Sequence, residues 1–173
     1  MAYSFTDGLA LVSEGGREGF IDTDGNYVIK LTDKVDYASF SDGYALIRKG
    51  NKWGFIDKKG NIVIKPAFYG AADFKEGFAS IMEKVGDKYL SGYINKKGKM
   101  ITKAIYEEVD DFQEGMACVK KNGKYGFINK KGKLVVNTIY NNAFSYENGL
   151  AYVVKGSNAY FIDKTGKKVI TIK

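Results

Sequence analysis

The sequence of 173 residues predicts an all-β protein of five tandem three-stranded antiparallel units, because two short patterns recur along it. In the first pattern an aromatic residue precedes Ile, then Asp or Asn, two variable residues and Gly. Its copies run from Phe20 to Gly25, Phe55 to Gly60, Tyr93 to Gly98, Phe127 to Gly132 and Phe161 to Gly166. The second pattern is aromatic-x-acidic-Gly-x-Ala. Its copies run from Phe5 to Ala10, Phe40 to Ala45, Phe74 to Ala79 and Phe112 to Ala117, with a looser fifth from Tyr146 to Ala151.

The even spacing of the second pattern predicts a stack of repeats. Its glycines, at 8, 43, 77, 115 and 149, are 35, 34, 38 and 34 residues apart, a period typical of solenoids and propellers, in which each unit buries its apolar face against a neighbour. We expect one repeat domain over residues 1–173, with repeats at about 1–35, 36–69, 70–107, 108–141 and 142–173. Whole units at both ends favour an open β-solenoid or superhelix, with a small five-bladed β-propeller as the alternative.

The first strand of each unit follows the glycine of the second pattern. Ala followed two residues later by Val or Ile recurs there in all five copies, as in Ala10 and Val12 or Ala45 and Ile47. Alternate residues of a strand share one face, so this face is predicted to be buried.

The second strand carries Gly before the aromatic residue in four copies, as in Gly54 before Phe55, and Tyr160 replaces it in the fifth. Gly within a strand indicates close approach of another backbone, and we expect a neighbouring repeat to make it. Tyr160 is then expected of a terminal repeat that no further repeat covers. The following Asp or Asn, two polar residues and Gly predict a hairpin with a type I turn and a G1 bulge.

The third strand follows this turn, as in residues 62–64, and a linker leads to the next repeat. The third copy is longer by four residues between Met82 and Ser91, which predicts a longer first hairpin.

Residues 52–60, Lys-Trp-Gly-Phe-Ile-Asp-Lys-Lys-Gly, and their echoes resemble the bacterial WG-repeat family, also called KWG. The second copy is nearest to the family pattern, and it alone keeps both Trp53 and Pro66. The resemblance covers essentially the whole chain. It implies a β-rich interaction scaffold with no catalytic residues to carry over. A weaker similarity to choline- and glucan-binding repeats is opposed by the 34-residue period and the Gly before the aromatic residue.

The net charge of +7 suits an acidic partner. Stacking would align the turns of the first pattern as a basic ridge, and the acidic turns of the second pattern as a separate edge. The ridge candidates are Lys58, Lys59, Lys96, Lys97, Lys130 and Lys131. Such a ridge either binds nucleic acid, teichoic acid or another polyanion, or only keeps a sheet edge solvated. The chain has just two arginines, Arg17 and Arg48, which argues against a protein that recognises a specific nucleic-acid sequence.

Most aromatic residues occupy recurring positions and are predicted to be core. Trp53 and Tyr125 lie at the variable position before the strand Gly, so we take them as candidates for an exposed binding surface for a protein, carbohydrate or cell-wall ligand.

The sequence contains no His and one Cys, Cys118, which removes the commonest acid-base residue and any imidazole or thiolate metal cluster. Acidic residues between Glu107 and Glu114 could suit a glycosidase or a calcium site, but acidic residues recur here as turn formers. We therefore expect no enzymatic activity, no metal and no cofactor.

These observations favour a non-enzymatic interaction module, in the first place for protein, with polyanion or carbohydrate binding as alternatives. No apolar run approaches the about 20 residues needed to span a bilayer. No signal peptide precedes the first repeat, which favours the cytoplasm.

Overall fold

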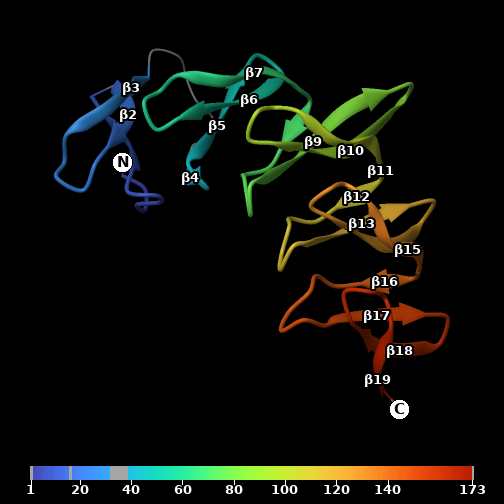
Figure 1. Cartoon of the computed structure of the whole chain (residues 1–173). Helices are drawn as coiled ribbons and strands as arrows, with labels where there is room; N and C mark the ends of the chain where they lie inside the picture. Colours follow the sequence, from blue (N-terminus) through green and yellow to red (C-terminus); the bar gives the residue numbers. More distant parts are fainter. Residues whose placement is uncertain (1, 16, 32–38, 173) are drawn as a thin grey trace. The chain divides into compact units, whose positions relative to one another are not determined.

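A computed structural model describes residues 2–15, 17–31 and 39–172, and the regular structure of these residues is all β (Figure 1). They form five antiparallel sheets of three or four strands, which confirms the predicted class of tandem β-repeats. No helix in this part of the chain is long and apolar enough to cross a membrane. The predicted boundary between the first two repeats, at residues 35 and 36, lies outside the described residues. The chain divides into two compact units, Met1–Gly77 and Phe78–Lys173.

Unit 1 contains the sheets of the first two repeats, with strand orders β1-β2-β3 and β4-β5-β6-β7. Its strands are β1 (Ala10–Glu14), β2 (Arg17–Ile21), β3 (Tyr27–Leu31), β4 (Phe40–Ser41), β5 (Tyr44–Lys49), β6 (Lys52–Asp57), β7 (Ile62–Phe68) and β8 (Gly70–Ala71).

Unit 2 contains the three long strands of the third repeat and the sheets of the fourth and fifth repeats. Its strands are β9 (Phe78–Val85), β10 (Lys88–Asn95), β11 (Met100–Tyr106), β12 (Glu108–Val109), β13 (Met116–Lys121), β14 (Lys124–Asn129), β15 (Leu134–Tyr140), β16 (Asn142–Ala143), β17 (Ala151–Lys155), β18 (Asn158–Ile162) and β19 (Lys168–Ile172). The predicted longer hairpin is confirmed, since β9 and β10 have eight residues each and their counterparts have five or six.

Short outer strands add to the three that the sequence predicts. Residues assigned to the linkers form β12 and β16, the first two residues of a second-pattern copy form β4, and each of these strands pairs with the first long strand of its repeat. In the fourth repeat, for example, Val109 lies opposite Val119. The linkers therefore extend the sheets instead of only crossing between them.

The predicted buried face of the first strand is observed in each repeat. Its alanines, Ala10, Ala45, Ala79, Ala117 and Ala151, are all at most 2% exposed. Small side chains on this face let the preceding sheet approach closely, which is how stacked repeats bury a continuous core.

The hairpin after the second strand has the predicted turn and bulge. In the second repeat, Asp57 Oδ1 accepts hydrogen bonds from the backbone N–H groups of Lys59 and Asn61, both at 2.9 Å. Gly60 has φ of 82°, and the register shifts between Phe55 and Ile56 as a G1 bulge requires. Hydrogen bonds from Asn61 lower the pKa of the Asp57 carboxyl. The other repeats have the same turn around Asp22, Asn95, Asn129 and Asp163.

The acidic residue and Gly of the second pattern form a two-residue hairpin turn. The φ angle lies between 51° and 54° at Asp7, Asp42, Glu76, Glu114 and Asn148, and between 81° and 88° at the glycines that follow them. Positive φ at both central positions is the signature of a type I′ turn, which matches the twist of the flanking strands.

The carboxylate of this turn reaches the equivalent turn of the next repeat. Asp7 accepts a hydrogen bond from the N–H of Gly43 at 2.6 Å, and Asp42 from that of Gly77 at 2.6 Å. In unit 2, Glu114 accepts one from the N–H of Gly149 at 2.9 Å. Hydrogen bonds to a charged acceptor are stronger than neutral ones, so each link offsets the strain of a non-Gly residue at positive φ.

An edge-to-face pair of aromatic rings lies beside the second-pattern turn of the second, third, fourth and fifth repeats. The aromatic residue of the second pattern packs on the second-strand aromatic of the preceding repeat, with ring centroids 4.7 to 5.1 Å apart. The pairs are Phe40 on Phe20, Phe74 on Phe55, Phe112 on Tyr93 and Tyr146 on Phe127, and every ring is at most 3% exposed. This ring pair and the turn link together define the repeat junction.

The strand glycine is approached by its own repeat, so the expectation of a neighbouring repeat is wrong. A Cβ on Gly54 would lie 2.4 Å from the carbonyl O of Ile64, on β7. Trp53 pairs with Phe68 while Phe55 pairs with Ile64, so β7 bulges over the glycine.

The explanation of Tyr160 by a missing next repeat is wrong for the same reason. Tyr160 pairs with Thr171 and Phe161 with Ile170, so β19 passes this position without the register shift that β7 has at Gly54. The Tyr160 ring points to the preceding repeat, 6.1 Å from the ring of Tyr140.

Candidate functional site

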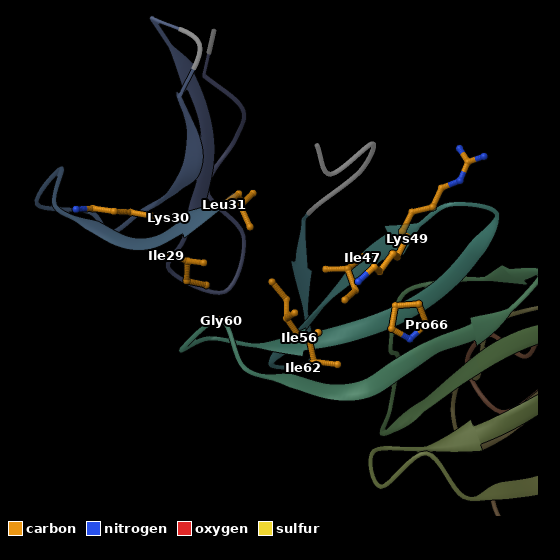
Figure 2. Close-up of a pocket in the computed structure, with 10 residues that line it drawn as sticks. Ile29, Lys30, Leu31, Ile47, Lys49, Ile56, Gly60, Ile62 and Pro66 are labelled. Carbon is orange, nitrogen blue, oxygen red and sulfur yellow. The ribbon is translucent and has the colours of Figure 1, made fainter. Parts of the chain in front are cut away.

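An apolar groove of about 180 Å³ lies within unit 1, where β3 faces β5 and β6 (Figure 2). Its apolar lining comes from six side chains, Ile29, Leu31, Ile47, Ile56, Ile62 and Pro66. The volume is below that of a drug-sized pocket, about 300 Å³ or more, yet similar to the about 150 Å³ that holds a benzene ring. The groove therefore fits one large apolar side chain.

Among the described residues, one side chain of this junction is less buried than its counterparts in unit 2. Tyr106 and Tyr140, at the ends of β11 and β15, are buried between sheets in unit 2. In unit 1, Ile47 is only partly buried, whereas its counterparts Val119 and Val153 have no exposed surface. Ile62 is 57% exposed at the mouth of the groove.

The polar lining of the groove is basic. Lys30, Arg48 and Lys49 line it, and no acidic residue is among the described lining residues. The Lys30 side chain points away from the cavity in Figure 2. The Arg48 Nε donates a hydrogen bond to the carbonyl of Gly50 at 3.0 Å, which holds its guanidinium near the end of the hairpin. The groove thus combines an apolar floor with a positive rim.

Trp53, one of the two aromatic candidates, lies next to this rim on β6. It pairs with Arg48 on one side and Phe68 on the other, and it is partly buried. The Arg48 guanidinium carbon lies 5.6 Å from the centre of the Trp53 ring, within the range of a cation–π contact. One face of the ring is therefore occupied by a cation.

Tyr125, the other aromatic candidate, is partly buried and is held by a similar pair in unit 2. Its hydroxyl donates to Glu108 Oε2 at 2.7 Å, and the Lys120 ammonium lies 2.7 Å from Glu108 Oε1 and 5.1 Å from the Tyr125 ring. The hydrogen bond to Glu108 raises the pKa of Tyr125, and the one from Lys120 lowers the pKa of Glu108. Three side chains from β12, β13 and β14 thus fix the ring in place.

The six lysines of the predicted ridge divide into two sets by their position in the turn. At the first position, Lys58 donates to the carbonyl O of Asp7 at 2.5 Å. In the fifth repeat, Lys164 at this position forms an ion pair of 3.1 Å with Glu114. Lys96 and Lys130 occupy the same position and also have interactions. At the second position, Lys59, Lys97 and Lys131 are exposed.

The prediction of a separate acidic edge is wrong at both of these contacts. Lys58 and Lys164 lie against the second-pattern turns of the preceding repeats, which contain Asp7 and Glu114. Part of the predicted ridge therefore joins repeats, and Lys58 and Lys130 at the first position are exposed to solvent as the second-position lysines are.

Cys118 and Asp110 carry side chains of the kinds that enzymes use, and burial raises the pKa of both. Burial raises the pKa of the Cys118 thiol to about 12, so it is protonated at neutral pH. Burial also raises the pKa of Asp110, which accepts a hydrogen bond from Ser145 at 3.4 Å. Within residues 2–15, 17–31 and 39–172, no three Cys, Asp or Glu side chains are grouped to hold a metal ion.

Sequence reasoning missed the groove. Ile29 and Ile56 stand at recurring core positions, and nothing in their spacing indicates a groove beside them. Arg48 gave the one available signal, because it is one of two arginines in a chain whose other basic residues are all lysines.

Comparison with known families finds a match to the model described as "WG containing repeat" over residues 19–53, 53–89, 92–125 and 125–158. No curated protein matches the chain.

Solved structures share its fold at low sequence identity. The structure of Kluyveromyces lactis Hsv2p is 12% identical, with a TM-score of 0.56 and 94% of this chain covered. A structure described as the eukaryotic initiation factor is 10% identical, with a TM-score of 0.61 and 99% covered. The chain spans 61% and 53% of the lengths of these two proteins.

Proposed function

Because the chain belongs to the family of WG-containing repeats, and unit 1 presents an apolar groove, we propose that it is a non-enzymatic module that binds another protein. The observation that carries this proposal is the groove of unit 1. In protein interfaces, the side chains that contribute most to binding fill desolvated pockets of the partner.

The chemistry of the groove favours an extended acidic segment with one large apolar residue. The apolar residue would enter the groove beside Ile47 and Ile62, where burying a Leu or Phe side chain contributes about 1.5–3 kcal/mol. Asp or Glu on either side of it would face Arg48 and Lys49. Charge complementarity of this kind speeds association and selects among partners.

A displayed library of random peptides tests this proposal. We expect the peptides enriched on the chain to contain Leu, Ile, Met or Phe flanked by Asp or Glu. Fluorescence polarisation of an enriched peptide then measures its affinity for the unchanged protein and for I62E, which places a charge at the mouth of the groove. We expect I62E to weaken binding about 30-fold, as loss of a hot-spot contact does.

The matched control is L134E. Leu134 pairs with Ile128 just as Ile62 pairs with Ile56, and it is also exposed, but it lies in unit 2. L134E should bind the peptide like the unchanged protein. A library without acidic, apolar binders, or a peptide that binds I62E as tightly, would contradict the proposal.

Polyanion binding is the second candidate, and the exposed second-position lysines favour it. Lys97 and Lys131 occupy equivalent turns of adjacent repeats in unit 2. The test is retention on heparin and on single-stranded DNA at increasing salt. The double variant K97E and K131E should elute at lower salt than a variant with two Lys-to-Glu changes elsewhere, such as K84E and K88E. Absence of binding at low ionic strength removes this candidate.

Carbohydrate binding through Trp53 and Tyr125 ranks third. Sugars stack on open ring faces, and a cation lies over each of these rings.

A further inference from the structure

The outer face of the fifth repeat exposes the groups that are buried at the repeat junctions. Phe161 stands at the position of Phe127, which has no exposed surface, but Phe161 is partly exposed. Ile170 pairs with Phe161 as Val136 pairs with Phe127, yet Ile170 is 49% exposed and Val136 only 5%. The Tyr152 ring lies 5.6 Å from that of Phe161 and extends the apolar area. This surface is one half of a repeat junction.

The front face of the first repeat leaves the aromatic ring and the hairpin turn of the other half uncovered, while Ala10 and Val12 on the same face are 2% and 8% exposed. Phe5 stands at the position of the second-pattern aromatics that pack on the preceding repeat, and it is 49% exposed. A Cβ on Gly25, in the hairpin turn, would meet no atom within 4 Å. A Cβ on the equivalent Gly166 would lie 3.3 Å from Val136 of the preceding repeat. The Phe5 ring and the Gly25 turn therefore lack the contacts with a preceding repeat that their counterparts in later repeats make.

We propose that copies of this chain associate head to tail, with the front face of the first repeat in one copy packed on the outer face of the fifth repeat in another. The junctions within the units are the template. Phe5 would pack on Phe161 as Tyr146 packs on Phe127, and the turn of Gly25 would cover Ile170 as that of Gly166 covers Val136.

The proposed interface between copies can also form a hydrogen bond equivalent to the turn link. Gly43 and Gly149 donate their N–H groups to Asp7 and Glu114 of the preceding repeats. Gly8 would donate to the side-chain O of Asn148, which stands at the acidic position of the fifth repeat with φ of 51°. A second copy is thus the partner whose shape and hydrogen bonds both faces already match.

The interface joins two different surfaces, so it is heterologous and generates chains or rings of copies, unlike a two-fold dimer. This inference goes beyond peptide binding, because it uses neither Arg48 nor the groove. Interfaces of this kind depend on a few aromatic anchors.

Sedimentation velocity of the 173-residue chain over a range of concentrations tests the proposal. The mass should rise with concentration above the 19.2 kDa of one chain. F5E and F161E should each weaken association by about 30-fold or more and sediment as single chains. An equimolar mixture of F5E and F161E should form pairs that grow no further, since each variant supplies one intact face.

Two further variants separate association from folding. I170E alters a side chain that is already exposed, so it should prevent association with unchanged circular dichroism. T171E is the control, because Thr171 is exposed and pairs with Tyr160, on the face toward the fourth repeat. T171E should associate normally.

Three results would overturn the proposal. The first is an unchanged protein that stays a single chain up to about 100 µM, since a specific interface is expected to be populated there. The second is a mixture of F5E and F161E that forms no pairs although both are folded. The third is a loss of association in T171E equal to that in I170E.

Discussion

Replacing Phe112 with Ala should test whether the ring pair holds a repeat junction together. Phe112 is buried, and its ring centroid lies 5.1 Å from that of Tyr93 and 4.8 Å from that of Phe78. Truncating a buried Phe to Ala costs about 3–5 kcal/mol, which includes the lost ring contacts. A domain of this size loses about 2–4 °C of melting temperature per kcal/mol, so we expect a decrease of roughly 6–20 °C.

Urea unfolding followed by circular dichroism measures the free energy of unfolding, at a concentration where the chain does not associate. F5A is the matched control, because Phe5 has the same place in its repeat but is half exposed. We expect F5A to lose about 1 kcal/mol or less, as surface changes do. If F112A lost less than about 1 kcal/mol, or F5A lost as much as F112A, the junction would not depend on the ring pair.

Three further changes have defined outcomes. G126A should lower the free energy of unfolding by about 1–2 kcal/mol in urea, because a Cβ at this position would lie 2.5 Å from the carbonyl O of Val136. Ala also reduces the conformational entropy of the unfolded chain, which offsets only part of this cost. D57N should leave the melting temperature unchanged at neutral pH and reduce its fall in acid. Folding lowers the pKa of Asp57 from 3.8, so the ionised carboxylate contributes fully to stability above that value, and this contribution is lost as the pH falls through the folded pKa. An Asn at this position can make the same turn, as Asn129 does in the fourth repeat. W53A should lower the free energy of unfolding by about 1–2 kcal/mol, because Trp53 is only partly buried.

Each of these outcomes can fail in a specific way. G126A with unchanged stability would mean that the bulge of β15 moves aside without cost. Equal acid sensitivity of D57N and the unchanged protein would assign the acid loss to other carboxylates. A loss above about 3 kcal/mol in W53A would place Trp53 in the core and remove it as a contact residue.

The local turns could be predicted from the sequence because their residue types determine their geometry. Asp57 accepts the two N–H groups that follow it, and Gly60 takes the positive φ that the bulge needs. The buried face that contains Ala45 followed in the same way from alternation along a strand.

Features that depend on the register between strands or on the stacking of repeats could not be predicted, because no single residue determines them. The bulge over Gly54 comes from β7 of the same repeat, and the pattern shows only that some backbone lies close. The contact of Lys58 with Asp7 depends on the stacking of two sheets, as does the groove beside Ile47. The choice between an open superhelix and a closed propeller stays a prediction.

The turn link bears on how such a chain can lengthen by gene duplication. Asp42 accepts from the turn of the following repeat while its own glycine, Gly43, donates to Asp7 of the preceding one. A repeat copied whole and inserted at any boundary would bring one donor and one acceptor, so the series of links would continue without a gap. A copy that began between the carboxylate and the glycine would interrupt the type I′ turn itself, which restricts the positions where recombination leaves a foldable product.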